Sequence, residues 1–127
     1  MTAATESTLA LAERFMAAIE TGDLDTARAI YAPDAKIWHN YDGIEQTPEE
    51  NLRVLKWMAR VLPTRKYEEV RRHITTDGWA QQHVLRGTLR NGDAFEMPAS
   101  LFVTVNNGLI TRLDEYLDPA QAAALSA

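Results

Sequence analysis

The hydrophobic pattern of this 127-residue chain changes its period at Pro63. Before this residue, apolar side chains recur at the spacing of an α-helix, and after it they tend to recur at every second position. A helical pattern buries one stripe of a cylinder, whereas an alternating pattern buries one face of a sheet. Because each pattern needs the other to cover its apolar side, the sequence predicts an α+β fold with helices on one face of a sheet.

Three helices and one short strand are expected before Pro63. Asp23 is a candidate N-cap for the second helix, which Pro33 stops, and Thr47 followed by Pro48 is typical of a helix start. The expected helices span residues 7–20, 24–32 and 48–62, and the strand spans residues 35–41.

Four longer strands are expected after Pro63, at residues 67–76, 79–90, 94–106 and 109–117. Short segments rich in glycine, asparagine and aspartate separate them, which is typical of hairpin turns. The element order is therefore α-α-β-α-β-β-β-β, with three N-terminal helices packed on a curved, mainly antiparallel sheet around a cavity. The alanine-rich tail at 119–127 is expected either to fray or to form a short helix.

Composition argues against several classes of function. The formal net charge of -5 and the pI near 5.1 disfavour a surface that binds nucleic-acid phosphates. The chain has no cysteine, which excludes disulfides, thiolate catalysis and cysteine-ligated zinc. No targeting segment and no apolar run of membrane-spanning length is recognisable. We therefore expect one globular domain over residues 1–127, cytoplasmic, with no nucleic-acid or membrane partner.

One carboxylate lies on the apolar side of the last expected strand. In steps of two, Leu113, Glu115 and Leu117 share a face, whereas Arg112 and Asp114 fall on the other. A carboxyl group among aliphatic side chains loses hydration and can then exchange a proton near neutral pH. Two interpretations stay open: Glu115 is a catalytic group inside a cavity, or the strand ends near Leu113 and Glu115 lies at its rim.

Histidines are the other candidates for proton transfer, because imidazole titrates near neutral pH. His83 shares the bulkier face of its strand with Trp79 and Gln81. It is expected either to carry a proton, oriented by Gln81 or paired with Glu115 across the sheet, or to be a core histidine. On the short strand, either His39 faces inward, or Trp38 faces inward and His39 lies at the rim.

His73, the third histidine, gives a weaker indication of function, and the sequence does not favour a metal site. His73 shares its face with Arg71 and Thr75, which indicates a pocket rim or a structural position. The three histidines fall on three different strands without the spacing of a metal-binding motif, so no metal site is expected. No glycine-rich phosphate loop and no local motif for a nucleophile is present.

Several short strings in this order resemble a known family. They are Thr21-Gly22-Asp23-Leu24-Asp25, Tyr31-Ala32-Pro33-Asp34-Ala35, Ile37-Trp38-His39, and Gly108-Leu109-Ile110-Thr111-Arg112 running into Glu115-Tyr116-Leu117-Asp118. Together with the element order they resemble the SnoaL-like proteins of the nuclear transport factor two-like, ketosteroid isomerase-like superfamily. The resemblance implies a cone-shaped α+β barrel with a deep apolar pocket, no cofactor, and a homodimer formed through the outer sheet face. The same fold hosts isomerases, cyclases, dehydratases and epoxide hydrolases, so it does not identify a reaction.

Two relatives are matched poorly at their functional positions. Ketosteroid isomerases have a tyrosine, an aspartate base and a neutral aspartic acid where this chain has Phe15, His39 and Ser100. The pair that stabilises an oxyanion would be missing, so ketosteroid isomerisation is not expected. Scytalone dehydratase has a pocket histidine similar to His73, but its aspartate on the first helix has no match.

Two other relatives are matched in part. Limonene epoxide hydrolases have an arginine and two aspartates where this chain has Gln81, His83 and Glu115, so only the last carboxylate is kept. SnoaL-type polyketide cyclases carry a Gln-x-His string similar to the one from Gln81 to His83. Their acid-base aspartate falls near Met97 or Ala99 in this chain.

These observations predict a cofactor-independent acid-base enzyme acting on a small hydrophobic carbonyl or epoxide compound, of the polyketide cyclase, isomerase or epoxide hydrolase type. The alternative is a non-catalytic domain that binds a small hydrophobic ligand or dimerises. The expected catalytic residues are His83, Glu115 and His39. The expected substrate-binding residues are Gln81, Phe15, Trp38, Trp79, His73 and Tyr116.

Overall fold

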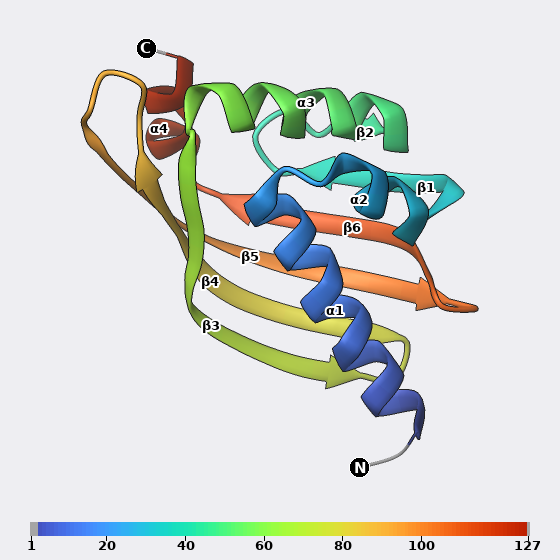
Figure 1. Cartoon of the computed structure of the whole chain (residues 1–127). Helices are drawn as coiled ribbons and strands as arrows, with labels where there is room; N and C mark the ends of the chain where they lie inside the picture. Colours follow the sequence, from blue (N-terminus) through green and yellow to red (C-terminus); the bar gives the residue numbers. More distant parts are fainter. Residues whose placement is uncertain (1–2, 127) are drawn as a thin grey trace.

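The structure is a computed structural model that describes residues 3–126. In chain order its elements are α1 (Ala3–Thr21), α2 (Leu24–Ile30), β1 (Tyr31–His39), β2 (Glu45–Gln46), α3 (Pro48–Val61), β3 (Thr64–Thr75), β4 (Gly78–Thr88), β5 (Ala94–Asn106), β6 (Leu109–Leu117), α4 (Pro119–Ala122) and the 3-10 helix η1 (Ala123–Ser126). The larger helices lie on one face of the sheet (Figure 1). The predicted α+β class and element order are confirmed, with β2 added, and of the two alternatives for the tail the structure has short helices. No helix within residues 3–126 has both the length and the apolar character needed to cross a bilayer.

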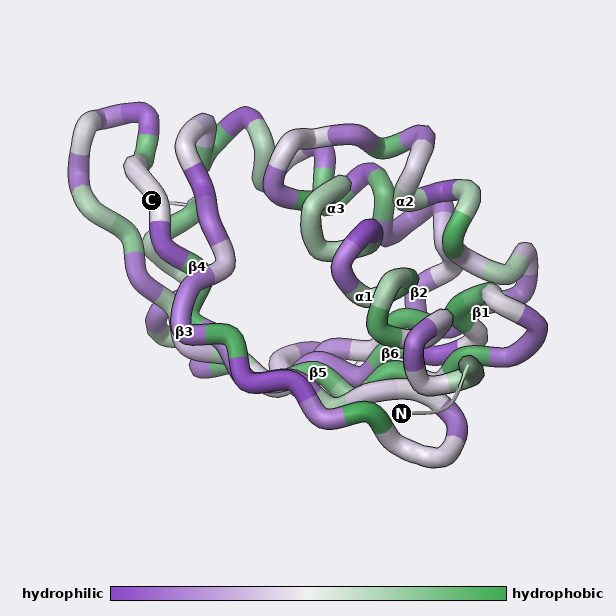
Figure 2. Tube along the Cα trace, turned by 60° about the horizontal axis from the view of Figure 1, so that its bottom comes forward, coloured by the Kyte–Doolittle hydropathy of each residue, from purple (hydrophilic) through white to green (hydrophobic). Residues whose placement is uncertain are grey.

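The sheet has the strand order β2-β1-β6-β5-β4-β3. The four long strands form the expected antiparallel meander, because each follows its neighbour after a tight turn. Strand β1 is added parallel to β6, which brings the N-terminal half of the chain to the end of the meander. The sheet is open rather than closed, and Figure 2 shows β3 and β4 rising beside the helices, so that the sheet curves around them.

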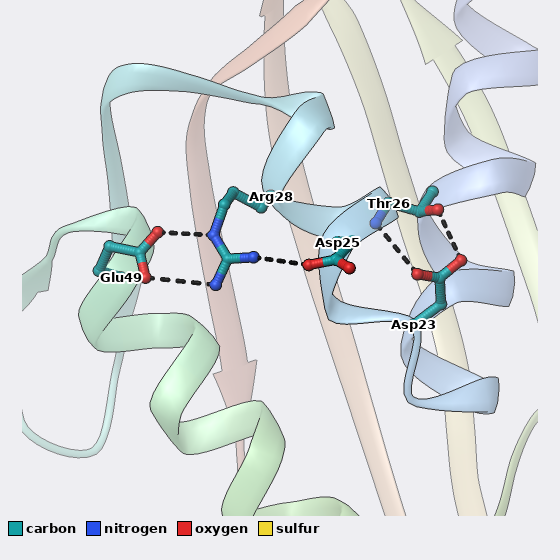
Figure 3. A network of polar contacts seen from close by, with 5 residues as sticks. All are labelled: Asp23, Asp25, Thr26, Arg28 and Glu49. Atoms are coloured by element: carbon teal, nitrogen blue, oxygen red, sulfur yellow. Dashed lines mark hydrogen bonds and ion pairs between the residues drawn. The ribbon is translucent and has the colours of Figure 1, made fainter.

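Polar contacts at the surface hold α2 against the start of α3. Asp23 caps α2 by accepting hydrogen bonds from the backbone nitrogen and the hydroxyl of Thr26, at 3.1 and 2.6 Å. Arg28 reaches Asp25 in its own helix at 2.9 Å and Glu49 of α3 at 2.8 Å (Figure 3). These groups are exposed, so the network orients the two helices more than it stabilises the fold.

An aromatic cluster forms the centre of the core. Phe15 of α1 meets Tyr31 of β1 and Trp79 of β4 edge to face, with ring centroids 5.5 and 6.5 Å apart. All three side chains are buried. The cluster therefore joins the first helix to two strands that are not neighbours in the sheet.

The largest difference from the predicted elements lies at the start of β1. The second helix was expected to continue toward Pro33, but it ends at Ile30 and the strand begins at Tyr31. Pro33 is tolerated within β1 for two reasons. The pairing of β1 with β6 is irregular between Tyr31 and Lys36, and β2 pairs only with Ile37 and Trp38. No ladder hydrogen bond is lost at that position.

A bulge in β3 reverses which residues of that strand face the helices. Glu69 has a φ of 53°, and the register with β4 shifts between Glu68 and Arg71. Tyr67 faces inward before the bulge and Arg72 faces inward after it, although they are an odd number of positions apart. An uninterrupted period of two cannot predict this change.

The capping box at the start of α3 gives a test of local stability. Thr47 accepts a hydrogen bond from the backbone nitrogen of Glu50, whose carboxylate accepts one from the backbone nitrogen of Thr47. Thr47→Ala removes the hydroxyl acceptor and is expected to lower the free energy of unfolding by about 1 kcal/mol in urea titrations. Thr47→Ser keeps the hydroxyl and should retain most of that stability. An equal loss in both variants would show that the methyl group, rather than the cap, is responsible.

Candidate functional site

A cavity of about 400 Å³ lies between α3, the C-terminal segment and the inner face of the sheet. Its wall is mainly apolar, formed by side chains such as Leu55, Met58, Leu85, Met97 and Leu125. A second cavity of about 40 Å³ lies deeper, against α1. The residues that line both are His39, Asn51, Leu55, Tyr67 and Glu115. The polar side chains of this shared set therefore lie at the inner end of the larger cavity, where they can contact a ligand.

His39 and Glu115 form the central polar pair of this site. They are register partners on the parallel strands β1 and β6, and the imidazole Nε2 lies 3.1 Å from the carboxylate Oε1. Their side chains are only 8% and 18% exposed. An ionised carboxylate only accepts hydrogen bonds, so a neutral His39 donates from Nε2 and keeps its lone pair on Nδ1. Among the described residues, Nδ1 has no hydrogen-bond partner.

The chain after His39 holds the two strands in this register. The backbone nitrogen of Asn40 donates to the carbonyl of Glu115 at 3.1 Å. The Asn40 side chain both donates to the carbonyl of Leu117 and accepts from its backbone nitrogen, each at 3.0 Å. The last strand thus continues regularly past Leu113, and Glu115 faces the cavity rather than a frayed rim. Asp114 lies on the opposite face, where it contacts Arg112.

Tyr67 of β3 is a polar wall residue that the sequence interpretation did not include. It lines both cavities, and its ring packs edge to face on His83 with centroids 4.6 Å apart. Burial, together with the nearby charge of Glu115, raises the pKa of its hydroxyl far above the ordinary value. Tyr67 is therefore a neutral hydrogen-bond donor at neutral pH. Its position near the start of an expected strand gave no signal for this role.

Asn51 of α3 is the other polar residue shared by the two cavities. Its Oδ1 accepts a hydrogen bond of 2.7 Å from the hydroxyl of Tyr31, and its Nδ2 donates to Gln46 at 3.3 Å. Burial raises the pKa of Tyr31, so its hydroxyl stays protonated as the donor. These contacts hold Asn51 in place from both sides and make it a fixed part of the wall.

His83 lies in a second layer behind Tyr67. Its Nδ1 is 2.8 Å from the Gln81 amide nitrogen, and the Gln81 oxygen accepts a 2.7 Å hydrogen bond from Nε of Arg72. The contact of Gln81 with His83, one of the two expected alternatives, is therefore present, while a role of His83 in proton transfer stays a prediction. Burial lowers the pKa of His83, and Arg72 adds to this, while the charge of Glu115 acts in the opposite direction.

The predicted pairing of His83 with Glu115 is wrong as a direct contact. Glu115 contacts His39, and no hydrogen bond or ion pair joins it to His83 in the described part of the chain. Strand β5 lies between them, since Leu101 pairs with Gln81 on one side and with Glu115 on the other. Neighbouring strands are about 4.8 Å apart. His83 and Glu115 are therefore separated by two such spacings, in addition to their offset along the strands.

The residues expected to bind substrate are divided between the two faces of the sheet. Phe15 lines the inner cavity, and Trp79 is buried behind it without lining either cavity. Trp38 and Tyr116 instead contact each other on the outer face, with ring centroids 5.3 Å apart. Each is next in sequence to a residue of the inward pair, and adjacent residues of a strand face opposite sides.

His73 also differs from its predicted position at a pocket rim. It pairs with Ala80 on the outer face and is exposed, because the bulge in β3 changes the alternation before it. In the described part of the chain, no three His, Cys, Asp or Glu side chains are grouped to hold a metal ion.

The lowered pKa of His83 makes the stability of the fold depend on pH. The unfolded chain, in which the ordinary value is 6.5, binds a proton at this position more readily than the folded protein. The free energy of unfolding should therefore decrease as the pH falls through about 6.5. In His83→Gln, which offers Gln81 an acceptor but does not titrate, urea unfolding between about pH 5 and pH 8 should show a smaller decrease. An unchanged decrease would contradict a buried, neutral His83.

Comparison with known proteins agrees with this architecture. The SnoaL-like domain matches residues 12–113. The sequence has no match among curated protein sequences. A putative polyketide cyclase from Xanthomonas campestris pv. campestris is 19% identical, with a TM-score of 0.83 over 97% of this chain and 98% of that one. IdmH, a putative polyketide cyclase from Streptomyces antibioticus, is 24% identical, with a TM-score of 0.80 over 94% and 97% of the two chains.

More distant sequences share the same fold. AclR, a putative hydroxylase from Streptomyces galilaeus, is 13% identical, with a TM-score of 0.83 over 96% of this chain and 82% of that one. At these identities the likeness concerns the fold, whereas the domain match covers most of the chain. The protein belongs to the SnoaL-like family.

Proposed function

We propose that this protein is a cofactor-independent acid-base enzyme that acts on a small, uncharged, hydrophobic compound with a carbonyl or epoxide group. The observation that carries the proposal is the pair of His39 and Glu115 at the wall common to both cavities. A largely buried imidazole beside a carboxylate is a typical arrangement for proton transfer. Structural neighbours named as putative polyketide cyclases support a cyclase or isomerase type of reaction.

The charge of the cavity wall supports an uncharged substrate. Glu115 is a carboxylate of the larger cavity, and neither lysine nor arginine is among the described residues that line it. A carboxylate or phosphate group entering this space would lose hydration without gaining a counter-charge. The apolar side chains of α3 and the C-terminal segment suit a compact ring system, and the volume lies within the usual range for small-molecule sites.

In the proposed reaction, His39 is the proton carrier. Its Nδ1 lone pair takes a proton from the carbon next to a ketone, and the electron pair of that C–H bond moves to form an enolate. Glu115 stabilises the imidazolium that results, because it already holds Nε2–H. Tyr67 donates a hydrogen bond to the developing oxyanion, and His39 returns its proton to another atom of the substrate. With an epoxide, the same base would instead activate a water molecule.

Deuterium uptake tests this step without knowledge of the natural substrate. A panel of neutral polycyclic ketones is incubated with the protein in D2O, and exchange next to the carbonyl is followed by mass spectrometry. His39→Phe is expected to reduce the exchange rate by about 100-fold or more, since it removes the base, and Glu115→Gln should also reduce it. His73→Phe is the matched control, because it removes an exposed histidine of the outer face.

Two outcomes would contradict the proposal. Exchange that persists in His39→Phe would show that another group is the base. Ketones that bind the wild-type protein without any exchange would support the alternative, a domain that binds small hydrophobic ligands.

We further propose that the protein forms a homodimer through the outer face of the sheet. Phe102 and Tyr116 are 51% and 47% exposed, and with Trp38 they form an aromatic cluster on β1, β5 and β6. Exposed aromatic side chains of this kind are enriched at protein interfaces. A two-fold axis near this cluster would let each copy cover the same side chains of the other.

Sedimentation velocity tests the dimer. Phe102→Glu places a charge in the aromatic cluster and is expected to convert the dimer into a monomer, because the carboxylate would be desolvated in the interface. Ala17→Glu, on the exposed side of α1, is the control and should leave the dimer intact. A monomeric wild-type protein at micromolar concentration, or a dimeric Phe102→Glu, would contradict this interface.

A further inference from the structure

The chain from Arg72 through Gln81 to His83 determines where the proton of His83 lies. Arg72 and Gln81 are register partners on β3 and β4, and the guanidinium Nε donates to the Gln81 oxygen at 2.7 Å. A guanidinium has donors only, so this contact requires the amide oxygen at that end. The amide NH2 group must then point toward His83, whose Nδ1 is 2.8 Å away.

An NH2 group donates and does not accept, so Nδ1 of His83 must be the acceptor. The neutral ring therefore carries its proton on Nε2, and this atom has no hydrogen-bond partner in the described part of the chain. Protonating Nδ1 as well would set one donor against another. To relieve that conflict the amide of Gln81 would have to turn over, which would place its NH2 group against the N–H of Arg72.

Burial of His83 favours the same neutral ring, and it outweighs the net effect of the charges around it. Arg72 of β3 faces it with a positive charge, Tyr67 of the same strand covers its ring with a neutral phenol, and Glu115 of β6 acts on it with a negative charge. His83 is 3% exposed. Burial has the largest effect and lowers the pKa of His83, Glu115 raises it, and Arg72 lowers it by less than Glu115 raises it, so the pKa is lowered overall.

We propose that Arg72, acting through Gln81, is a positioning residue that holds His83 neutral with its proton on Nε2, so that His39 is the only histidine of the inner face that takes up a proton. This role rests on the proposed acid-base function. The two inward histidines are then held in opposite ways: a carboxylate receives the N–H of His39 and stabilises its imidazolium, whereas an amide N–H occupies the basic nitrogen of His83.

The decisive variant is Gln81→Glu, which changes one group and almost no volume. A carboxylate at this position would accept from Arg72 and also from Nδ1 of His83, so it would attract a proton to the nitrogen that the amide keeps unprotonated. In the wild-type protein, 15N NMR of the histidine ring at neutral pH is expected to show His83 protonated on Nε2 alone. In Gln81→Glu the proton should move to Nδ1 or both nitrogens should be protonated, and the titration midpoint of His83 should rise.

Matched controls separate this effect from a general effect of charge. Gln82→Glu adds the same charge at the next position, on the exposed outer face, and should leave the His83 signals as in wild type. Arg72→Met removes the group that orients the amide and should produce a mixture of both His83 tautomers. Arg71→Met, the exposed neighbour, should not. Wild-type His83 protonated on Nδ1, or the same tautomer in wild type and Gln81→Glu, would overturn the inference.

The pH profile of deuterium exchange tests the consequence for catalysis. The wild-type profile is expected to need no ionisation of His83, and Gln81→Glu should add one once His83 also titrates. A wild-type profile that requires two ionising imidazoles would contradict the role assigned to Arg72. The NMR result does not require turnover, so a protein that exchanges no ketone but keeps His83 protonated on Nε2 would refute the proposed function and leave the Arg72 assignment standing.

Discussion

The parallel pairing of β1 with β6 is the contact on which the rest of the arrangement depends. It joins the helical half of the chain to the last strand of the meander, through residues such as Asn40 and Leu117 that are 77 positions apart in sequence. Because parallel neighbours in register lie on the same face, the pairing places His39 beside Glu115. It also orders the chain that leads to α3, whose first turns supply Asn51 to the cavity wall. The contact between the imidazole and the carboxylate exists only because these two strands pair.

The two inward histidines show how the same residue type acquires different chemistry from its surroundings. His39 contacts a carboxylate, whereas His83 contacts an amide N–H and has its pKa lowered, mainly by burial. Under the proposed function, this difference in surroundings would assign the acid-base role to His39. Tyr67, between His83 and the cavity, adds a neutral donor to the same wall.

Alternation along the strands assigns two separate tasks to neighbouring residues. On β1 and β6, one set of side chains forms the polar end of the cavity and the next set forms the aromatic cluster of the outer face. The site and the proposed interface are therefore back to back across a single sheet. A change of register by one residue would exchange the two sets, which gives a physical reason for the double hydrogen bond of Asn40 with Leu117.

The sequence by itself determined the helices and strands and, for most strands, which side chains share a face. The change of period at Pro63, the turns of the meander and the shared face of Gln81 and His83 follow from local alternation, which left open whether Glu115 faces inward or lies at a rim. Only the tertiary structure decided that His39 is the partner of Glu115, because that contact depends on which distant strand pairs with β6. It also decided that Tyr67 and Arg72 face inward and His73 outward, because one bulge at Glu69 reverses the alternation. A period of two describes a strand between such interruptions, but the position of a bulge and the choice of a partner strand are set by packing across the whole fold.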